Sequence, residues 1–149
     1  MYEVYALKYG ERDTTTCQFF YREPRHDPLT LEPKLGGRLL HVVDAGVSFV
    51  VGHVEVWEPP RRLALTWRLT NFTSEQQTRV DVRFEPAADG TRVSVTHSGW
   101  DAIPAAHPAR HGMSDRAFVL FRGHWWADLL TAAKRHMERS RTAAGKDVP

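Results

Sequence analysis

The sequence predicts an α+β fold, with an antiparallel β-sheet in the first two thirds of the chain and one long helix near the C-terminus. Hydrophobic and polar residues alternate through the region before Gly99, which is typical of strands that bury one face. After Gly99 the hydrophobic spacing changes to three and four residues, which is typical of an amphipathic helix. The 149 residues suffice for a hydrophobic core, and no repeat or linker divides them, so we expect one domain spanning residues 1–149.

The N-terminal part is expected to form a β-hairpin followed by a loop. Residues 2–9 and 14–22 are rich in Tyr, Thr, Val and Phe, and they flank a polar turn at residues 10–13. Residues 23–33 contain three prolines, which remove backbone donors and exclude a regular helix. We therefore expect a connecting loop there, with room for one short edge strand.

Five further strands in a meander are predicted from the alternation and from the turns between the strands. In one of them Leu63, Leu65 and Trp67 share a face, and the residues between them belong to the other face. The sequences Glu58-Pro59-Pro60-Arg61 and Ala88-Asp89-Gly90-Thr91 have the composition of hairpin turns. The expected strands cover residues 38–44, 48–57, 62–69, 79–84 and 92–96.

A long helix is predicted to begin at Ser114-Asp115, because a serine at that position can cap it. Two apolar rows follow at helical spacing, and together they form a wide stripe that we expect to lie deep against the sheet. The main row is Phe118, Phe121, Trp125, Leu129 and Ala133, and the second is Val119, Trp126, Leu130 and Met137. The sequence becomes polar and basic after Lys134, so a frayed tail is expected at residues 140–149, clearest from Thr142.

Several motifs in the order found here resemble a known superfamily. They include Leu31-Glu32-Pro33-Lys34-Leu35-Gly36-Gly37-Arg38-Leu39, then Trp57-Glu58-Pro59-Pro60-Arg61-Arg62-Leu63, and then Thr96-His97-Ser98-Gly99-Trp100. Together with the Trp-rich final helix, they are similar to the SRPBCC (START-like) superfamily. Specifically, they resemble its AHSA-type branch, which is similar to the C-terminal domain of the activator of the ninety-kilodalton heat-shock protein ATPase. The resemblance covers residues 29–139.

This resemblance implies a helix-grip fold, in which a curved antiparallel sheet wraps the C-terminal helix and leaves a cavity between them. Members typically hold small apolar molecules, and the family shares no catalytic residue set, so we expect no catalytic residue and no cofactor. The candidates for contact with an apolar ligand are Trp67, Phe84, His97, Phe118, Phe121, Trp125 and Leu129. Two alternatives are a chaperone-linked interaction module in the stress response and a cyclase-type or hydrolase-type enzyme.

Residues 1–28 depart from the family pattern. Members usually begin with a strand followed by one or two short helices, whereas residues 1–22 read as a hairpin. Their sequence resembles the opening of metallo-β-lactamase-fold hydrolases, but the His-x-His-x-Asp-His zinc motif of those enzymes is absent. No metal is therefore expected. Without the short helices, an open groove or a homodimer that covers it becomes an alternative to a closed cavity.

The histidines offer two further candidate sites. His97 shares the strand face of Val93 and Val95, so it should point inward, as a hydrogen-bonded core residue, a ligand contact or a general base that could pair with Asp101. His107 and His111 have a spacing that can hold zinc on a helix. Prolines on either side of His107 favour a solvated loop instead.

Composition excludes several classes of partner. The formal net charge is only +2, and the basic residues near the C-terminus suit a solvated helix end, so no nucleic-acid partner is expected. No apolar stretch approaches the roughly 18 residues that a membrane span requires, and no secretion signal begins the sequence. We therefore expect a cytoplasmic protein without a membrane partner.

Overall fold

One antiparallel sheet dominates the structure, and each strand pairs with its neighbours in the sequence, in the order β1-β2-β3-β4-β5-β6. The computed structural model describes residues 29–144 except residues 45–46 and 89. The predicted hairpin at residues 1–22 and the end of the predicted tail lie outside the described residues. The strands are β1 (Leu29–Leu31), β2 (Arg38–Asp44), β3 (Val47–Glu58), β4 (Arg62–Trp67), β5 (Thr78–Ala87) and β6 (Gly90–Ser98).

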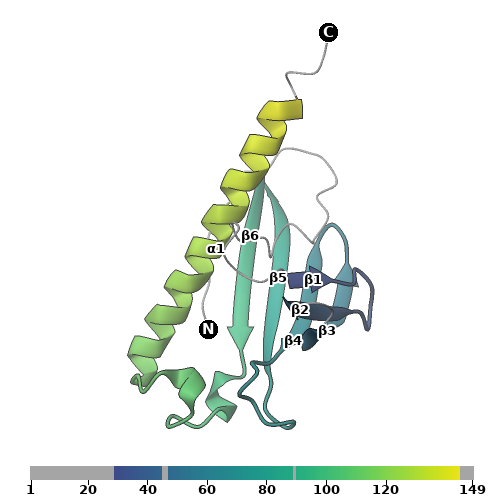
Figure 1. Ribbon diagram of the computed structural model, residues 1–149. Coiled ribbons are helices and arrows are strands. Elements are labelled where there is room, and N and C mark those ends of the chain that lie inside the picture. Colours follow the sequence, from purple (N-terminus) through teal and green to yellow (C-terminus); the bar gives the residue numbers. More distant parts are fainter. Residues whose placement is uncertain (1–28, 45–46, 89, 145–149) are drawn as a thin grey trace.

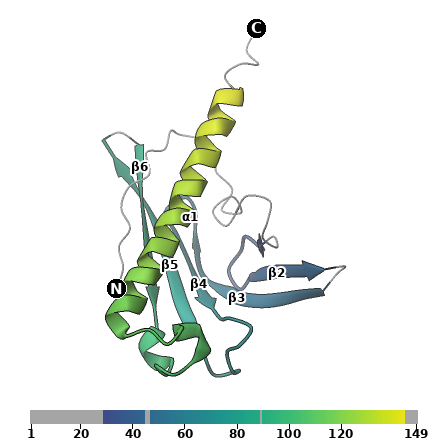
Figure 2. The same ribbon diagram turned by 60° about the vertical axis from the view of Figure 1, so that its left-hand side comes forward.

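The predicted meander is confirmed, and β1 supplies the short edge strand expected within residues 23–33. β4 ends at Trp67, two residues earlier than expected, whereas β5 and β6 are longer than the alternation indicated. The register shifts between Leu39 and Leu40 on β2 and between Val54 and Val56 on β3. Such irregularities increase the twist of a sheet. Figure 2 shows the result, since β2 and β3 lie across the direction of β5 and β6.

A close backbone approach accompanies the first of these shifts. A Cβ atom added to Gly52 on β3 would lie 1.7 Å from the carbonyl oxygen of Thr66 on β4. Only glycine fits such a contact between neighbouring strands. Gly52 therefore has a direct structural role, because it lets β3 and β4 approach closely where the sheet curls.

The C-terminal helix α1 (Asp115–Ala144) is 30 residues long and spans about 45 Å at the usual rise. Ser114 caps it as predicted, since its Oγ accepts a hydrogen bond from the Ala117 amide at 3.4 Å. Figures 1 and 2 show α1 beside β6, with its last turns extending beyond the sheet. The expected tail at residues 140–149 is wrong for residues 140–144, which stay helical because neither Gly nor Pro occurs between Gly123 and Gly145.

The buried face of α1 differs from the predicted main row. The buried side chains are Phe118, Arg122, Trp126, Leu130 and Ala133, which succeed one another at intervals of three or four. Phe121, expected in the main row, is 38% exposed, and Val119 of the second row is exposed as well. Trp125 and Leu129 are half-buried beside the central row. The helix is therefore rotated relative to the prediction, and a charged residue, Arg122, lies in the middle of its buried face.

Two hydrophobic clusters fill the interior. The main cluster lies between the sheet and the middle of α1 and contains Trp126 and Leu130. The second cluster joins the first turn of α1 to the loops before it, and it consists of Phe72, Trp100, Ile103, Ala109 and Phe118. Among the described residues, no helix combines the length and the hydropathy that crossing a membrane requires.

Candidate functional site

His97 is the most deeply buried titratable residue in the described part of the chain, with 1% of its surface exposed. It lies on β6 opposite Val80 of β5, and it shares the inward face of its strand with Val93 and Val95. The predicted inward orientation is therefore confirmed. The side chain comes to lie between the sheet and α1, where its ring contacts Trp67, Trp100 and Trp126.

Both ring nitrogens of His97 form hydrogen bonds. Nδ1 lies 3.1 Å from Nη2 of Arg122 and 3.2 Å from Nε1 of Trp126. A guanidinium and an indole N–H can only donate, so Nδ1 must accept both bonds. The ring proton is then on Nε2, which donates to Oγ1 of Thr78 at 2.8 Å. The Thr78 hydroxyl in turn donates to the carbonyl oxygen of Trp67 at 3.0 Å.

This arrangement keeps the imidazole neutral. Burial lowers the pKa of His97 well below 6.5, and the nearby Arg122 charge lowers it further. Neither nitrogen has a lone pair available for a substrate proton, so the geometry suits a structural hydrogen-bonding role and not a general base. The suggested pair with Asp101 is absent, since Asp101 is exposed and His97 is bonded to Thr78, Arg122 and Trp126.

Arg122 links the two clusters through its guanidinium. Its Cζ lies 4.9 Å from the ring centroid of Trp100 and 4.5 Å from that of Trp125. Cation–π contacts of this kind are stronger where water is excluded, as it is here, because Arg122 is buried. The hydrophobic pattern of the helix did not indicate Arg122 as a site residue. The available signal was its spacing of four residues from both Phe118 and Trp126, which places a charge on the buried face.

Three of the predicted site residues, Trp67, His97 and Trp125, have their rings close together. The Trp67 ring lies 6.1 Å from that of His97 and 6.2 Å from that of Trp125, both edge-on. Trp126, which was not a predicted site residue, lies 6.3 Å from Trp67 and completes the group. Edge-to-face pairs at these distances add to the stability that burial provides.

Seven large apolar side chains are only half-buried and pack against the main cluster. They come from β1, β3, β5, α1 and the segment after β4, and they are Leu29, Phe49, Trp57, Leu69, Phe84, Trp125 and Leu129. We call these seven residues the half-buried apolar set. Phe84, Trp125 and Leu129 were predicted site residues. The other four were missed, although Phe49 and Trp57 occupy inward positions of a strand that the alternation had identified.

Two predicted site residues lie elsewhere. Phe118 belongs to the second cluster, where its ring is 4.9 Å from that of Trp100. Phe121 is partly exposed, and its ring lies 5.2 Å from that of His111. The reason is local, because the loop before α1 wraps around the first turns of the helix. Arg110 of this loop is stacked on Phe118, with its Cζ 4.6 Å from the ring centroid.

The two histidines with zinc-like spacing have separate contacts. Nδ1 of His107 accepts a hydrogen bond from the Ala109 amide at 3.1 Å, and its ring lies 5.4 Å from that of Phe72. His111 has a left-handed backbone, with φ at 56°, and contacts Phe121 instead. Within residues 29–144, apart from the undescribed positions, no three His, Cys, Asp or Glu side chains are grouped as metal ligands.

Known proteins resemble this chain in sequence and in fold. Residues 18–117 match the family model described as activator of Hsp90 ATPase homolog 1-like protein. This match confirms the resemblance seen in the motifs, and it includes residues 18–22 of the segment that resembles a hydrolase opening. No curated protein matches the chain.

Two solved structures illustrate the likeness in fold. Protein MLL2253 from Mesorhizobium loti has 18% identity and a TM-score of 0.53, over 74% of each chain. A protein of unknown function from Staphylococcus aureus, SA2116, has 15% identity and a TM-score of 0.52, over 95% of this chain and 94% of that one. At such identities the likeness shows the fold alone, which is the helix-grip arrangement of a curled sheet and a long helix.

Proposed function

The chain belongs to the activator of Hsp90 ATPase homolog 1-like family, and on this basis we propose that it binds a small apolar molecule between its sheet and α1. The observation that carries this proposal is the half-buried apolar set. Its seven side chains come from both sides of the interior, the strands and the helix, and all of them pack against the same cluster. An apolar molecule in contact with the set would lie between these two layers.

Hydrophobic burial would drive such binding. Each square ångström of apolar surface removed from water contributes about 25 cal/mol, and four of the seven residues have large aromatic rings. Binding sites for small molecules are usually lined by apolar and aromatic side chains with few polar groups. The set has this composition. The ring nitrogens of His97 and the hydroxyl of Thr78 are bonded to other groups of the protein. Selectivity for a ligand would therefore come from the shape of the site and from other polar groups around it.

A titration with a neutral apolar dye such as Nile red tests the proposal. Dye emission should rise and saturate, and tryptophan emission should change with it, because Trp57 and Trp125 belong to the set. Leu129→Glu places a charge in the set and should weaken dye binding. Leu120→Glu is the matched control, because Leu120 lies on the same helix but is 56% exposed and outside the set. The absence of a saturable change in the unaltered protein would contradict the proposal.

A second candidate function, a chaperone-linked interaction module, is favoured by one surface feature. Val119, Leu120 and Phe121 are consecutive apolar residues of α1, and all three are exposed. Exposed apolar patches often mark contacts between proteins. The family description names activation of the Hsp90 ATPase. If this function holds, the protein should stimulate that ATPase, Leu120→Glu should reduce the stimulation, and Leu129→Glu should leave it unchanged. No stimulation by the unaltered protein would exclude this candidate.

A further inference from the structure

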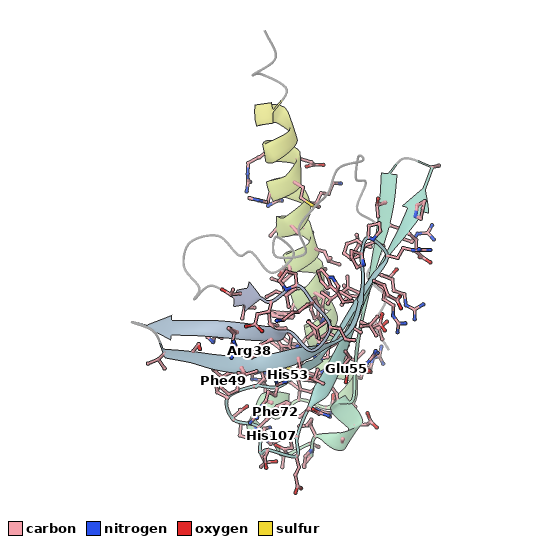
Figure 3. All side chains as sticks on the ribbon, turned by 90° about the vertical axis from the view of Figure 1, so that its right-hand side faces the viewer. Arg38, Phe49, His53, Glu55, Phe72 and His107 are labelled. Carbon is pink, nitrogen blue, oxygen red and sulfur yellow. The ribbon has the colours of Figure 1, made fainter. Side chains whose placement is uncertain are left out.

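Arg68 differs from the neighbouring arginines in its surroundings. It follows β4 directly, and its Cζ lies 5.5 Å from the ring centroid of Phe49, a member of the half-buried apolar set. Its Nη2 reaches the carbonyl oxygen of Phe72 at 3.4 Å. Figure 3 labels Phe49 and Phe72 on the same side of strands β2 and β3. Arg68 is thus a half-buried cation at the margin of the proposed site.

The guanidinium of Arg68 has unused donors. Its Nε is buried and forms no hydrogen bond with the described residues, and the contact with Phe72 is long for a hydrogen bond. Several other arginines of the described chain meet carboxylates, as Arg62 does at Asp81 over 2.7 Å and Arg110 does at Asp115. Leaving a buried donor unpaired costs free energy, and this cost is recovered when an acceptor arrives.

We propose that the apolar molecule carries a carboxylate, and that this carboxylate binds the Arg68 guanidinium while the apolar body lies against Phe49 and the rest of the half-buried apolar set. The inference rests on the proposed function and adds a ligand class to it. A planar guanidinium binds a carboxylate through two parallel hydrogen bonds, which are stronger than neutral ones. Fatty acids and aromatic acids share this chemistry, and the set contains both aliphatic and aromatic side chains.

Matched pairs of probes test the inference. Decanoate and its methyl ester have the same chain, and naphthoate and its methyl ester have the same rings, so each pair differs in the charged group. Binding is measured by displacement of Nile red. In the unaltered protein each acid should bind more tightly than its ester. The pair with the higher affinity then shows whether the apolar body is aliphatic or aromatic.

Three variants identify the residue responsible. Arg68→Gln should weaken binding of the acid by at least about tenfold, the usual effect of losing a hydrogen bond to a charged group, and should leave the ester unchanged. Arg68→Lys keeps the positive charge but cannot donate two parallel hydrogen bonds to a carboxylate, so its loss of affinity for the acid should be smaller than that of Arg68→Gln. Arg83→Gln is the control, because Arg83 is 58% exposed and contacts Asp81 outside the set. Thermal unfolding checks that each variant is folded.

The outcomes separate the two proposals. Equal affinity for acid and ester in the unaltered protein would overturn the inference and leave the apolar site standing. An acid preference that survives in Arg68→Gln would overturn it as well. If neither the dye nor any acid or ester binds, the proposed function fails and the inference fails with it.

Discussion

Trp126 of α1 donates a hydrogen bond from its indole Nε1 to Nδ1 of His97 on β6, over 3.2 Å. Both side chains have only 1% of their surface exposed, so this bond lies within the main cluster. Arg122, one turn earlier on the helix, donates to the same nitrogen. Two hydrogen bonds from α1 therefore share Nδ1 of His97 as their acceptor. Together they fix the rotation of the helix relative to the sheet.

Replacement of His97 should destabilise the protein by removing this shared acceptor. His97→Leu leaves the buried donors of Arg122 and Trp126 without their acceptor, and we expect the free energy of unfolding to fall by about 2–4 kcal/mol. His97→Gln supplies one acceptor and one donor, so its loss should be smaller. Urea unfolding at neutral pH, followed by circular dichroism, measures both variants. Equal losses for Leu and Gln would show that the hydrogen bonds contribute little.

Acid should weaken the fold through the same residue. Because the pKa of His97 is held well below 6.5, the unfolded chain takes up a proton below that pH while the folded chain does not. The free energy of unfolding should therefore be unaffected by His97 above pH 6.5. It should decrease below it by up to about 1.4 kcal/mol per pH unit, until the lowered pKa is reached. Urea unfolding over mildly acidic pH in the unaltered protein and in His97→Gln measures this contribution, because the other titrating groups are common to both. If the free energy of unfolding fell equally with pH in the two proteins, His97 would not be the source of the acid sensitivity.

Gly52→Ala should be strongly destabilising, because its new methyl group would overlap the carbonyl oxygen of Thr66. We expect a loss of about 3 kcal/mol in the free energy of unfolding, since the strands must separate locally. Gly112→Ala is the comparison, because a Cβ there meets nothing within 4 Å, although φ is +65°. That variant should lose only about 1–2 kcal/mol, through backbone strain. Thermal or urea unfolding decides between them, and a smaller loss at Gly52 than at Gly112 would refute this account.

Arg110 should contribute more stability than its ion-pair partner. Arg110 donates to the carbonyl oxygen of Trp100 at 3.0 Å, stacks on Phe118 and pairs with Asp115. Arg110→Met should lower the free energy of unfolding by about 2 kcal/mol, because a buried carbonyl loses its donor. Asp115→Asn should cost less than about 1 kcal/mol, since this carboxylate is 86% exposed. Urea unfolding of both variants measures the difference, and similar losses would mean that the ion pair dominates.

The strands were the most predictable part of the fold. β2 has the bounds that its alternation and flanking glycines indicated, and short turns account for the pairing of β2 with β3, of β3 with β4 and of β5 with β6. β4 was less predictable. Leu69 continues the alternation of Leu63, Leu65 and Trp67, yet the ladder stops at Trp67, where the backbone turns toward Phe72 and the second cluster. Alternation reports which side chains are apolar, but not where backbone pairing ends.

The candidate site was predictable only in part, because its polar members break the hydrophobic pattern. His97 was found from its strand face, and Trp67 and Trp125 from their place on an inward face or helical stripe. Arg122 was missed because a charged residue inside a helix stripe normally faces solvent, and it is buried here only because indole faces and an imidazole nitrogen receive it. Arg68 has no local signal, since its contact with Phe49 depends on the curl of the sheet.

The three indoles of Trp67, Trp125 and Trp126 lie within 4.9–6.3 Å of one another, at interplanar angles of 65–76°. Chromophores that are this close and not parallel share their excited states, and the shared excitation gives a paired positive and negative band in far-ultraviolet circular dichroism. One of these rings belongs to the sheet and two belong to the helix. The part of the band pair that couples Trp67 to the two helix rings therefore exists only while α1 is seated on β4, and its loss would report that the helix has left the sheet.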